Sequence, residues 1–401
     1  MRIPVVVLIF LAATTATAQW QLQESHSKAS FRGVHSLGGG VAWVSGTEGT
    51  VLRTEDGGVT WQHCTVPPGA EKLDFRGVQG FDAKTAFVMS SGTGDLSRLY
   101  KTTDGCQTWT LVFTNPDADG FFDALTIPRF ADAAYQKELM LLGDPVNGHM
   151  AVWTVKKDAK PGEVPKRVGK TPKPLPDEGS FAASNSALFD FSRGDFWIFG
   201  TGGPGGARVI VAQYGQTSGA GDYVFTYGGI GSKEVPVGNR SKSSGVFSVA
   251  VKLSPDWHEH SSHPSNRAAG HHRPSAAEEH LMKMGYNTVV VGGDYMKPDD
   301  TTANAAYFDR TDRKPGWKAA MTQPHGFRSA VAYSAEGDAW IAVGPNGTDV
   351  SSDDGKNWDA LRPGPTDAPG ADKNWNALSL PFVVGPHGRI GVLRKDALPA
   401  E

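Results

Sequence analysis

The sequence predicts an all-β protein, a seven-bladed β-propeller of four-stranded antiparallel blades that is closed by the N-terminal strand. Three observations support this prediction. An eight-residue turn occurs three times, short apolar strands recur about every 45 residues around it, and the last repeat lacks a fourth strand that the N-terminal segment can supply. Glycine is abundant, at 49 residues, beside 11 tryptophans and 19 phenylalanines. This mixture of turn-forming and aromatic residues is typical of many short strands.

The first residues have the pattern of a leader that is removed during export. Arg2 supplies a positive charge, residues 5–13 are apolar, and Ala16 and Ala18 form an A-x-A cleavage site. The apolar run is shorter than the ~20 residues that a membrane-spanning helix needs. We therefore expect residues 1–18 to be a signal peptide, and the mature protein, beginning at about Gln19, to be periplasmic or secreted without a membrane span.

Each regular repeat begins with an apolar strand, followed by a second and a third strand that lead into the turn. The first strands begin at Phe31, Phe75 and Phe327, and the second strands lie at residues 42–44, 86–88 and 339–341. Less regular repeats begin at residues 121–124, 181–183 and 246–249. The seventh begins at Trp375 and has only three strands, so residues 20–23 are expected to pair with it. Ring closure of this kind removes the free edges of an open sheet.

Two insertions interrupt a propeller that is expected to span residues 19–396, with residues 397–401 as a tail. Residues 156–178 are rich in Lys and Pro and predict an exposed loop. Residues 252–287 hold six of the twelve histidines, between His258 and His280, and residues 276–284 could form a short helix. Because prolines and a glycine interrupt this run, no rigid ligand spacing is imposed. We interpret it as a solvated insertion and expect neither a metal nor a cofactor.

The three repeated turns, residues 54–61, 102–109 and 351–358, share one template. A hydroxyl residue is followed two positions later by Asp, usually by a Gly two positions after that, and finally by Trp. The Asp can accept backbone N–H bonds, the Gly can adopt a positive φ, and the Trp begins the fourth strand and buries a large apolar area. The conserved template therefore assigns a structural role to Asp56, Trp61, Asp104, Trp109, Asp353 and Trp358.

Cys64 and Cys106 are the only cysteines, and an even pair in an exported protein predicts a disulfide. Cys64 follows the turn of the first repeat on its outermost strand, and Cys106 replaces the usual Gly inside the turn of the second. Both positions are peripheral and belong to neighbouring blades. Two unlinked thiols are the alternative. The net charge of −3 suggests neither nucleic-acid binding nor a polybasic membrane contact.

The repeated turn resembles the Asp-box, or bacterial neuraminidase repeat, and residues 19–396 resemble the photosystem II stability/assembly-factor family of propellers, in its non-photosynthetic bacterial branch. The resemblance is carried by the Phe-Arg-Gly strand starts, the three turns, and residues 142–145, 291–295 and 342–347. It implies a non-catalytic binding platform for a protein or a small anionic ligand, and we expect a monomer.

In a propeller, the starts of the innermost strands and the turns between second and third strands meet at one end of the channel. The candidate binding residues at that rim are Arg32, Arg76, Arg328, Asn376, Asp123, Glu48, Asp144, Asp294, Tyr295 and Asn346. The three arginines occupy equivalent positions in the first, second and sixth repeats, so we expect them to line one side of the mouth and suit a carboxylate or phosphate. Alternatively, each arginine pairs with a neighbouring acid, and Asp144 and Asp294 are turn residues.

Two classes of function are consistent with this pattern. The first is an exported, non-enzymatic propeller that binds a protein or an anionic ligand. The second is a sialidase-like exo-glycosidase, which would use an arginine triad on a substrate carboxylate together with a positioned acid and a nucleophile. The repeat places no Tyr–Glu nucleophile pair on the rim, and residues 127–129 read Ile-Pro-Arg instead of Arg-Ile-Pro. We therefore expect no catalytic residues.

Overall fold

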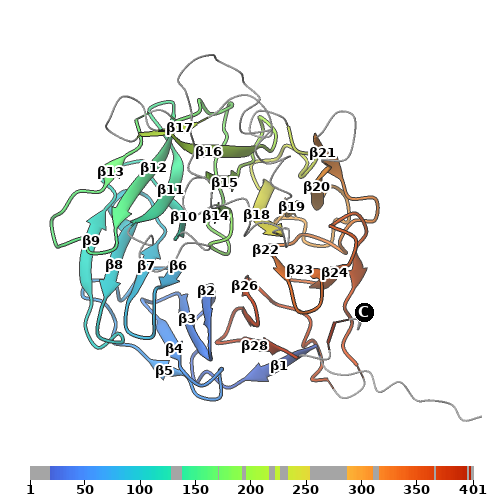
Figure 1. Ribbon diagram of the computed structural model, residues 1–401, viewed down its shortest axis with the longest axis horizontal. Coiled ribbons are helices and arrows are strands. Elements are labelled where there is room, and N and C mark those ends of the chain that lie inside the picture. Colours follow the sequence, from blue (N-terminus) through green and yellow to red (C-terminus); the bar gives the residue numbers. More distant parts are fainter. Residues whose placement is uncertain are drawn as a thin grey trace, which may run out of the picture.

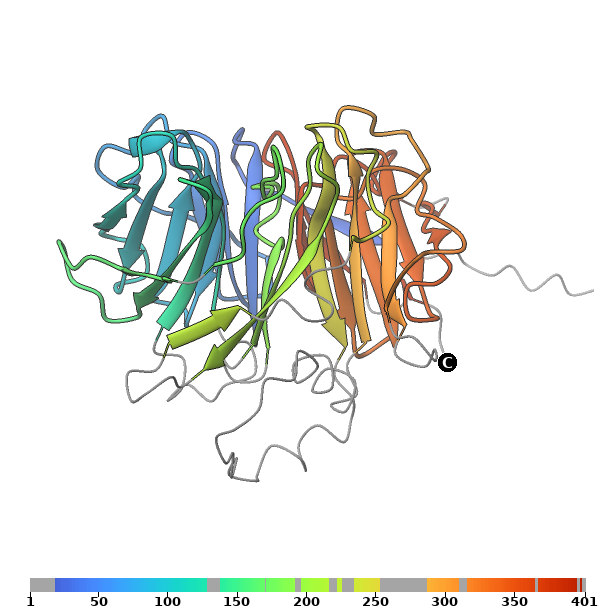
Figure 2. The same ribbon diagram turned by 90° about the horizontal axis from the view of Figure 1, so that it is seen from above.

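The computed structural model describes residues 19–127, 138–169, 171–191, 196–215, 222–225, 234–252, 287–309, 316–364, 367–394 and 397–398. Seven four-stranded antiparallel sheets are arranged radially around a central channel (Figures 1 and 2). This confirms the predicted seven-bladed propeller. The predicted leader and the histidines between His258 and His280 lie outside the described residues.

The strands run from the channel outward in each blade. Blades 1 and 2 consist of β2 (Phe31–Gly38), β3 (Val41–Gly46), β4 (Val51–Thr54) and β5 (Gln62–His63), then β6 (Phe75–Gly80), β7 (Ala86–Ser90), β8 (Arg98–Thr102) and β9 (Thr110–Thr114). A short 3-10 helix, η1 (Gly94–Leu96), precedes β8. Blade 3 consists of β10 (Phe122–Thr126), β11 (Glu138–Val146), β12 (His149–Lys156) and β13 (Lys166–Arg167).

The remaining blades follow the same order. Blade 4 has β14 (Leu188–Phe191), β15 (Phe196–Gly200), β16 (Val209–Gly215) and β17 (Asp222–Phe225), and blade 5 has β18 (Ser244–Lys252), β19 (Asn287–Asp294), β20 (Ala305–Asp309) and β21 (Gly316–Ala319). Blade 6 has β22 (Ala330–Ser334), β23 (Ala339–Gly344), β24 (Gly347–Ser351) and β25 (Asp359–Ala360), and blade 7 has β26 (Ala377–Ser379), β27 (Phe382–Val384), β28 (Ile390–Leu393) and β1 (Trp20–Gln23).

The N-terminal strand closes the ring, as predicted. Strand β1 (blue) lies antiparallel beside β28 (red), with Trp20 opposite Leu393 (Figure 1). Trp20 is 1% exposed, its ring centroid lies 6.0 Å from that of Trp375, and its Nε1 donates to Thr348 Oγ1 at 3.1 Å. Burial of this large aromatic side chain stabilises the closure, together with the pairing of β1 and β28.

The three repeated turns are held by the hydrogen bonds that their sequence predicts. Asp56 Oδ1 accepts the Thr60 backbone N–H at 2.9 Å, and both Thr60 and Thr54 donate hydroxyl bonds to the carboxylate. The side-chain bond from Thr60, followed by its backbone bond, lowers the pKa of Asp56 to about 2. The same contacts recur at Asp104 and Asp353, so these carboxylates serve the turns.

Cys64 and Cys106 form the predicted disulfide, with their Cα atoms 5.2 Å apart. Cys106 adopts φ 64°, the left-handed conformation that the Gly of the template would otherwise supply. The neighbouring Thr65 donates its backbone N–H to the Cys106 carbonyl at 3.2 Å and its hydroxyl to the same oxygen at 3.0 Å. The disulfide therefore joins blade 1 to the turn of blade 2.

Two local predictions differ from the structure. The predicted loop at residues 156–178 contains β13, the short fourth strand of blade 3. The first strand of blade 4 is β14, which begins at Leu188, whereas residues 181–183 were expected to begin it. Residues 181–186 instead form turns inside the ring, where their polar side chains bond to other blades, as described below.

Candidate functional site

The innermost strands of four blades carry a β-bulge near their starts, at the end of the channel we call the upper mouth (top of Figure 2). The bulged residues are Arg32, Arg76, Asp123 and Phe247, each lying between two paired residues of its strand. Bulges re-aim a side chain and are common next to functional sites. The upper mouth therefore combines two arginines, an aspartate and an aromatic ring.

Arg328 does not belong to this set, because blade 6 is shifted by one residue relative to the expected alignment. The backbone N–H of Phe31 donates to Gly385 O, that of Trp375 to Gly344 O, and that of Arg328 to Gly292 O. Arg328 is therefore equivalent to the buried aromatics Phe31 and Trp375, and Ser329 takes the position of Arg32. A one-residue shift turns a side chain to the opposite face of a strand.

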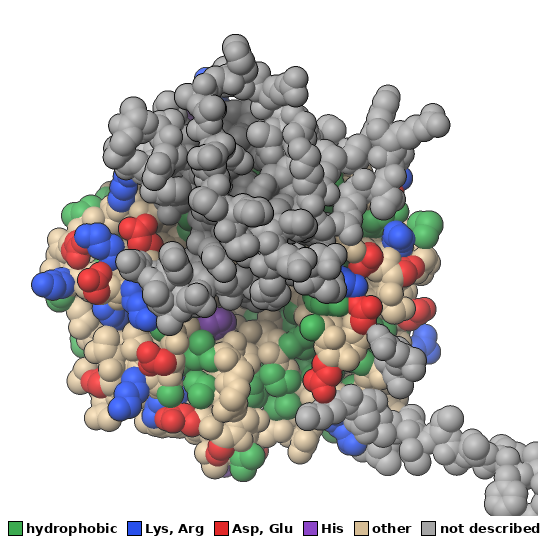
Figure 3. All heavy atoms as spheres, viewed as in Figure 1, with side chains coloured by type: hydrophobic (Ala, Val, Ile, Leu, Met, Phe, Trp, Pro, Cys, Tyr) green, Lys and Arg blue, Asp and Glu red, His purple; other side chains and the backbone are tan. Residues whose placement is uncertain are grey.

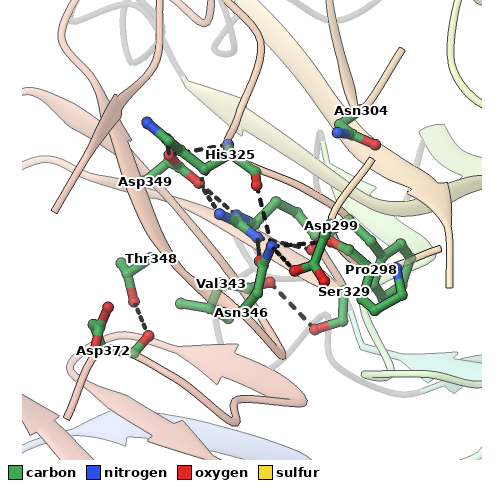
Figure 4. A network of polar contacts seen from close by, with 12 residues as sticks. Pro298, Asp299, Asn304, His325, Ser329, Val343, Asn346, Thr348, Asp349 and Asp372 are labelled. Atoms are coloured by element: carbon green, nitrogen blue, oxygen red, sulfur yellow. Dashed lines mark hydrogen bonds and ion pairs between the residues drawn. The ribbon is translucent and has the colours of Figure 1, made fainter. Parts of the chain in front are cut away.

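Arg328 is consequently a structural residue and not part of a three-arginine rim. Its side chain and that of Asp349 are both 0% exposed and form an ion pair, with Nε donating to Asp349 Oδ2 at 2.5 Å. Asn346, another candidate rim residue, accepts from Arg328 Nη1 and donates to Asp299 and to the Pro298 carbonyl. Figure 4 shows this network, with Asn346 between Asp349 and Asp299.

The two remaining arginines lie close together and are incompletely neutralised. Arg76 donates from Nε to Asp74 Oδ2 at 2.8 Å and from Nη1 to the Ala182 carbonyl at 3.2 Å. Arg32 is half-buried, and its Nε is buried without a hydrogen-bond partner in the described part of the chain. Burial, and next the charge of Arg76, lowers the pKa of Arg32, while Asp74 opposes this effect. An additional anion beside Arg32 would therefore be favourable.

Asp123 and Asp144, from adjacent strands of blade 3, form a carboxyl pair beside Arg76. Asp123 is 1% exposed and its Oδ2 has no hydrogen-bond partner among the described residues. Burial, and next the charge of Asp144, raises the pKa of Asp123 well above its ordinary value. Burial also raises the pKa of Asp144 to about 6, although the Ser180 N–H donates to its Oδ1 at 3.2 Å. Asp144 is thus a partly exposed acid with a raised pKa beside the mouth.

Three other candidates have local roles or lie apart from this group. Asn376 Nδ2 donates to the Phe31 carbonyl at 2.8 Å, which ties blade 7 to blade 1. Asp294 accepts hydrogen bonds from Ser243 and Asn239; burial acts to raise its pKa, but these bonds lower it overall. Glu48 is exposed in a turn with φ 59°.

Tyr295 belongs to an aromatic cluster that faces the arginines across the ring. Its side chain is 50% exposed and its ring meets Phe247 edge to face at 6.0 Å. Phe181 stacks on Phe247 at 3.9 Å, and Phe327 meets Phe247 edge to face at 4.7 Å. Ala182, next to Phe181, holds Arg76 through its carbonyl. The aromatic and cationic parts of the upper mouth are therefore connected by one segment.

Residues 181–186, which we call the crossing segment, reach from one side of the channel to the other. Asn185 Oδ1 accepts the Leu125 N–H of blade 3 at 2.8 Å. Ser184 Oγ donates to the Ser329 carbonyl of blade 6 at 2.7 Å, and Ser186 Oγ donates to Ser248 Oγ of blade 5. These contacts close the channel between its two ends. No periodic pattern in the sequence predicts them.

Within the described residues, no group of three or more His, Cys, Asp or Glu side chains is placed to hold a metal ion. Among those same residues there is also no helix with the length and apolar character required to cross a bilayer.

Comparison with known proteins supports the propeller fold. No protein-family model matches the sequence, and no curated protein is detectably similar to it. The chain is similar to YCF48 bound to D1 peptide, with 13% identity and a TM-score of 0.50 over 94% of this chain and 97% of that one. It is also similar to YCF48 from Cyanidioschyzon merolae, with 16% identity and a TM-score of 0.50 over 94% of this chain and 99% of that one. A third similar structure is the GH74 xyloglucanase from Xanthomonas campestris, with 13% identity and a TM-score of 0.57; the match covers 96% of this chain and 55% of that one. At these identities the likeness establishes the fold alone.

Proposed function

We propose that this protein is an exported, non-catalytic propeller whose upper mouth binds an anionic group of a protein or small-molecule ligand. The observation that carries the proposal is Arg32, a half-buried guanidinium whose buried Nε has no hydrogen-bond partner among the described residues and which has the positive charge of Arg76 beside it. A charge removed from water without a partner is unfavourable, and a carboxylate or phosphate would supply that partner with charge-assisted hydrogen bonds.

Two further observations support parts of the proposal. The Cys64–Cys106 disulfide is typical of an oxidising compartment, which agrees with export through the predicted leader. One of the structural neighbours is a propeller described as bound to a peptide, so a peptide carboxylate is a reasonable class of ligand to test. We also propose that the repeated turns belong to the Asp-box class and that the chain is a bacterial relative of the photosystem II assembly factors, acting as a monomer.

The test uses inorganic phosphate and N-acetylglycine as probes, measured by titration calorimetry at low salt. We expect Arg32→Gln to weaken binding about tenfold or more, because a hydrogen bond to a charged group contributes about 1.5–3 kcal/mol. Arg167→Gln is the matched control, since it removes the same charge from the outermost strand β13, where Arg167 pairs with Asp117 at 3.0 Å. A parent protein that binds neither probe, or an Arg32→Gln variant that binds both as the parent does, would refute the proposal.

The sialidase-like alternative requires three arginines around one substrate carboxylate. Because Arg328 is fully buried and paired with Asp349, the proposed triad has only two members at the mouth. Hydrolysis of a fluorogenic sialoside by the purified protein, lost in Asp144→Asn, would favour the enzyme over the binding platform.

A further inference from the structure

The opposite end of the channel holds a cavity that is unrelated to the arginines. Its volume is about 630 Å³, and it is lined by the innermost strands or the residues just after them in all seven blades. We call it the lower cavity. It opens toward the face with the repeated turns, which is the face viewed in Figures 1 and 3. Its volume is within the range of about 300–1,000 Å³ that is typical of small-molecule sites.

The crossing segment makes this cavity blind. Ser186 lines the cavity and also bonds to Ser248, while Ser184 and Asn185 are held by blades 6 and 3. The crossing segment therefore lies between the lower cavity and the upper mouth, with Ser186 on the side of the cavity. This segment distinguishes the cavity from an open, water-filled channel.

Most of the described side chains that line the lower cavity are apolar, and none of them carries a formal charge at neutral pH. Among the described lining residues there is no Lys, Arg, Asp or Glu, and the polar side chains are His35, Ser36, Ser186, Tyr333 and Ser379. Valine, leucine, isoleucine, alanine and phenylalanine side chains form the rest. A charged ligand would lose its hydration here without gaining a partner, which is unfavourable. An uncharged ligand with an apolar body would gain from burial at about 25 cal/mol per Å².

Two aromatic rings of the lining are held in place from outside. Lys157 Nζ lies 4.4 Å from the ring centroid of Phe81 in blade 2, and Lys252 Nζ lies 4.9 Å from that of Tyr333 in blade 6. The Tyr333 hydroxyl also bonds to Asp338. Such contacts restrict the rings before a ligand arrives, so less conformational entropy is lost on binding. Green hydrophobic side chains are visible near the centre of this face in Figure 3.

One wall offers a small polar site. The Gly80 N–H donates to His35 Nδ1 at 3.0 Å, which places the proton of the neutral imidazole on Nε2. The Ser36 N–H, on the same strand β2 as His35, donates to Ser379 Oγ of the neighbouring blade 7 at 3.0 Å. This combination of a few hydrogen-bonding groups with extensive apolar walls is common in sites that orient a small ligand.

We propose that the lower cavity is a second binding site, and that it takes an uncharged small molecule with a mainly aromatic or aliphatic surface. This site is independent of anion binding at the upper mouth, because the crossing segment separates the two and their chemistry is opposite.

The test compares two fluorescent probes with nearly the same rings. N-phenyl-1-naphthylamine is uncharged, and 8-anilino-1-naphthalenesulfonate carries a sulfonate. We expect one uncharged probe to bind per chain, at least tenfold more tightly than the sulfonate. Equal or tighter binding of the sulfonate would overturn the proposal, since it would mean a generic apolar surface or a cationic site.

Cavity-filling variants locate the site. Ala332→Trp places an indole inside the lumen, and Ala335→Trp places one at the exposed edge of the cavity, where it does not disturb packed residues. Each should weaken binding of the uncharged probe at least tenfold. Ala319→Trp, which adds the same side chain at the exposed end of β21, should stay within about twofold of the parent. If Ala332→Trp does not fold, Ala335→Trp decides the question, and parent-like binding by a folded Ala335→Trp protein would refute the site.

Discussion

Blade 6 contains a buried ion pair where blade 1 has two apolar residues, and this allows a sharp prediction. Arg328 corresponds to Phe31, and Asp349 corresponds to Leu52, by the strand pairing of Ala342 with Asp349 and of Val44 with Leu52. Phe31 and Leu52 are each 0% exposed and lie in one apolar cluster. The ion pair is therefore a polar replacement of a standard contact within the blade.

We expect Arg328→Phe alone to lower the free energy of unfolding by about 3–5 kcal/mol, because Asp349 would remain buried as an unpaired charge. Asp349→Leu alone should cost a similar amount, since it leaves the guanidinium unpaired. The double variant Arg328→Phe/Asp349→Leu recreates the pair of blade 1 and should lie within about 2 kcal/mol of the parent. The cost that remains comes from His325 and Asn346, which lose their bonds to the pair but are partly exposed and can bind water.

Urea unfolding monitored by tryptophan fluorescence measures these changes as shifts of the midpoint at constant slope. Arg362→Gln, at an exposed position after β25, is a control for loss of one positive charge. A single Arg328→Phe variant as stable as the parent would refute the reasoning, as would a double variant no more stable than the weaker single one.

Three other predictions concern closure, the disulfide and pH. Deleting residues 19–25 should open the ring and sharply lower the melting temperature, and Trp20→Ala alone should cost about 3–5 kcal/mol; a deletion variant that melts like the parent would contradict the closure. Reducing the Cys64–Cys106 bridge, with a sequence separation of 42, should cost roughly 4 kcal/mol or less, and two thiols titrating in the unreduced exported protein would exclude it. The pKa of Asp144 is raised from 3.8 to about 6 in the folded state, so the free energy of unfolding should fall by up to about 3 kcal/mol as pH rises from about 4 to 6. The Asp144→Asn variant should flatten this pH dependence, and a variant with the parent's pH profile would contradict the prediction.

The predictions that the structure confirms depend on chemistry within a few residues. The Asp56 carboxylate accepts hydrogen bonds from Thr54 and Thr60, so the turn can be recognised from its own residues. Short apolar runs that recur about every 45 residues mark the strands, and the missing strand of blade 7 identified β1 as its partner. The disulfide followed from two peripheral positions in neighbouring repeats.

The candidate site was only partly predictable, because its geometry depends on register. Phe75-Arg76 and Phe327-Arg328 look alike in the sequence, yet a shift of one residue buries Arg328 while Arg76 remains at the mouth. No turn residue in the sequence indicates this one-residue shift of the first strand of blade 6. In the structure it is visible from the backbone bond of Arg328 to Gly292.

The sequence by itself determined the number of blades, the closure of the ring, the turns and the disulfide, because periodicity and turn chemistry are local properties. Only the tertiary structure decided which arginines remain at the mouth, that residues 181–186 cross the channel, and that a blind apolar cavity lies below them. Those features depend on contacts between distant residues, such as Ser184 with Ser329. Such contacts form only when the ring has closed, since closure brings the innermost strands of all seven blades around one axis.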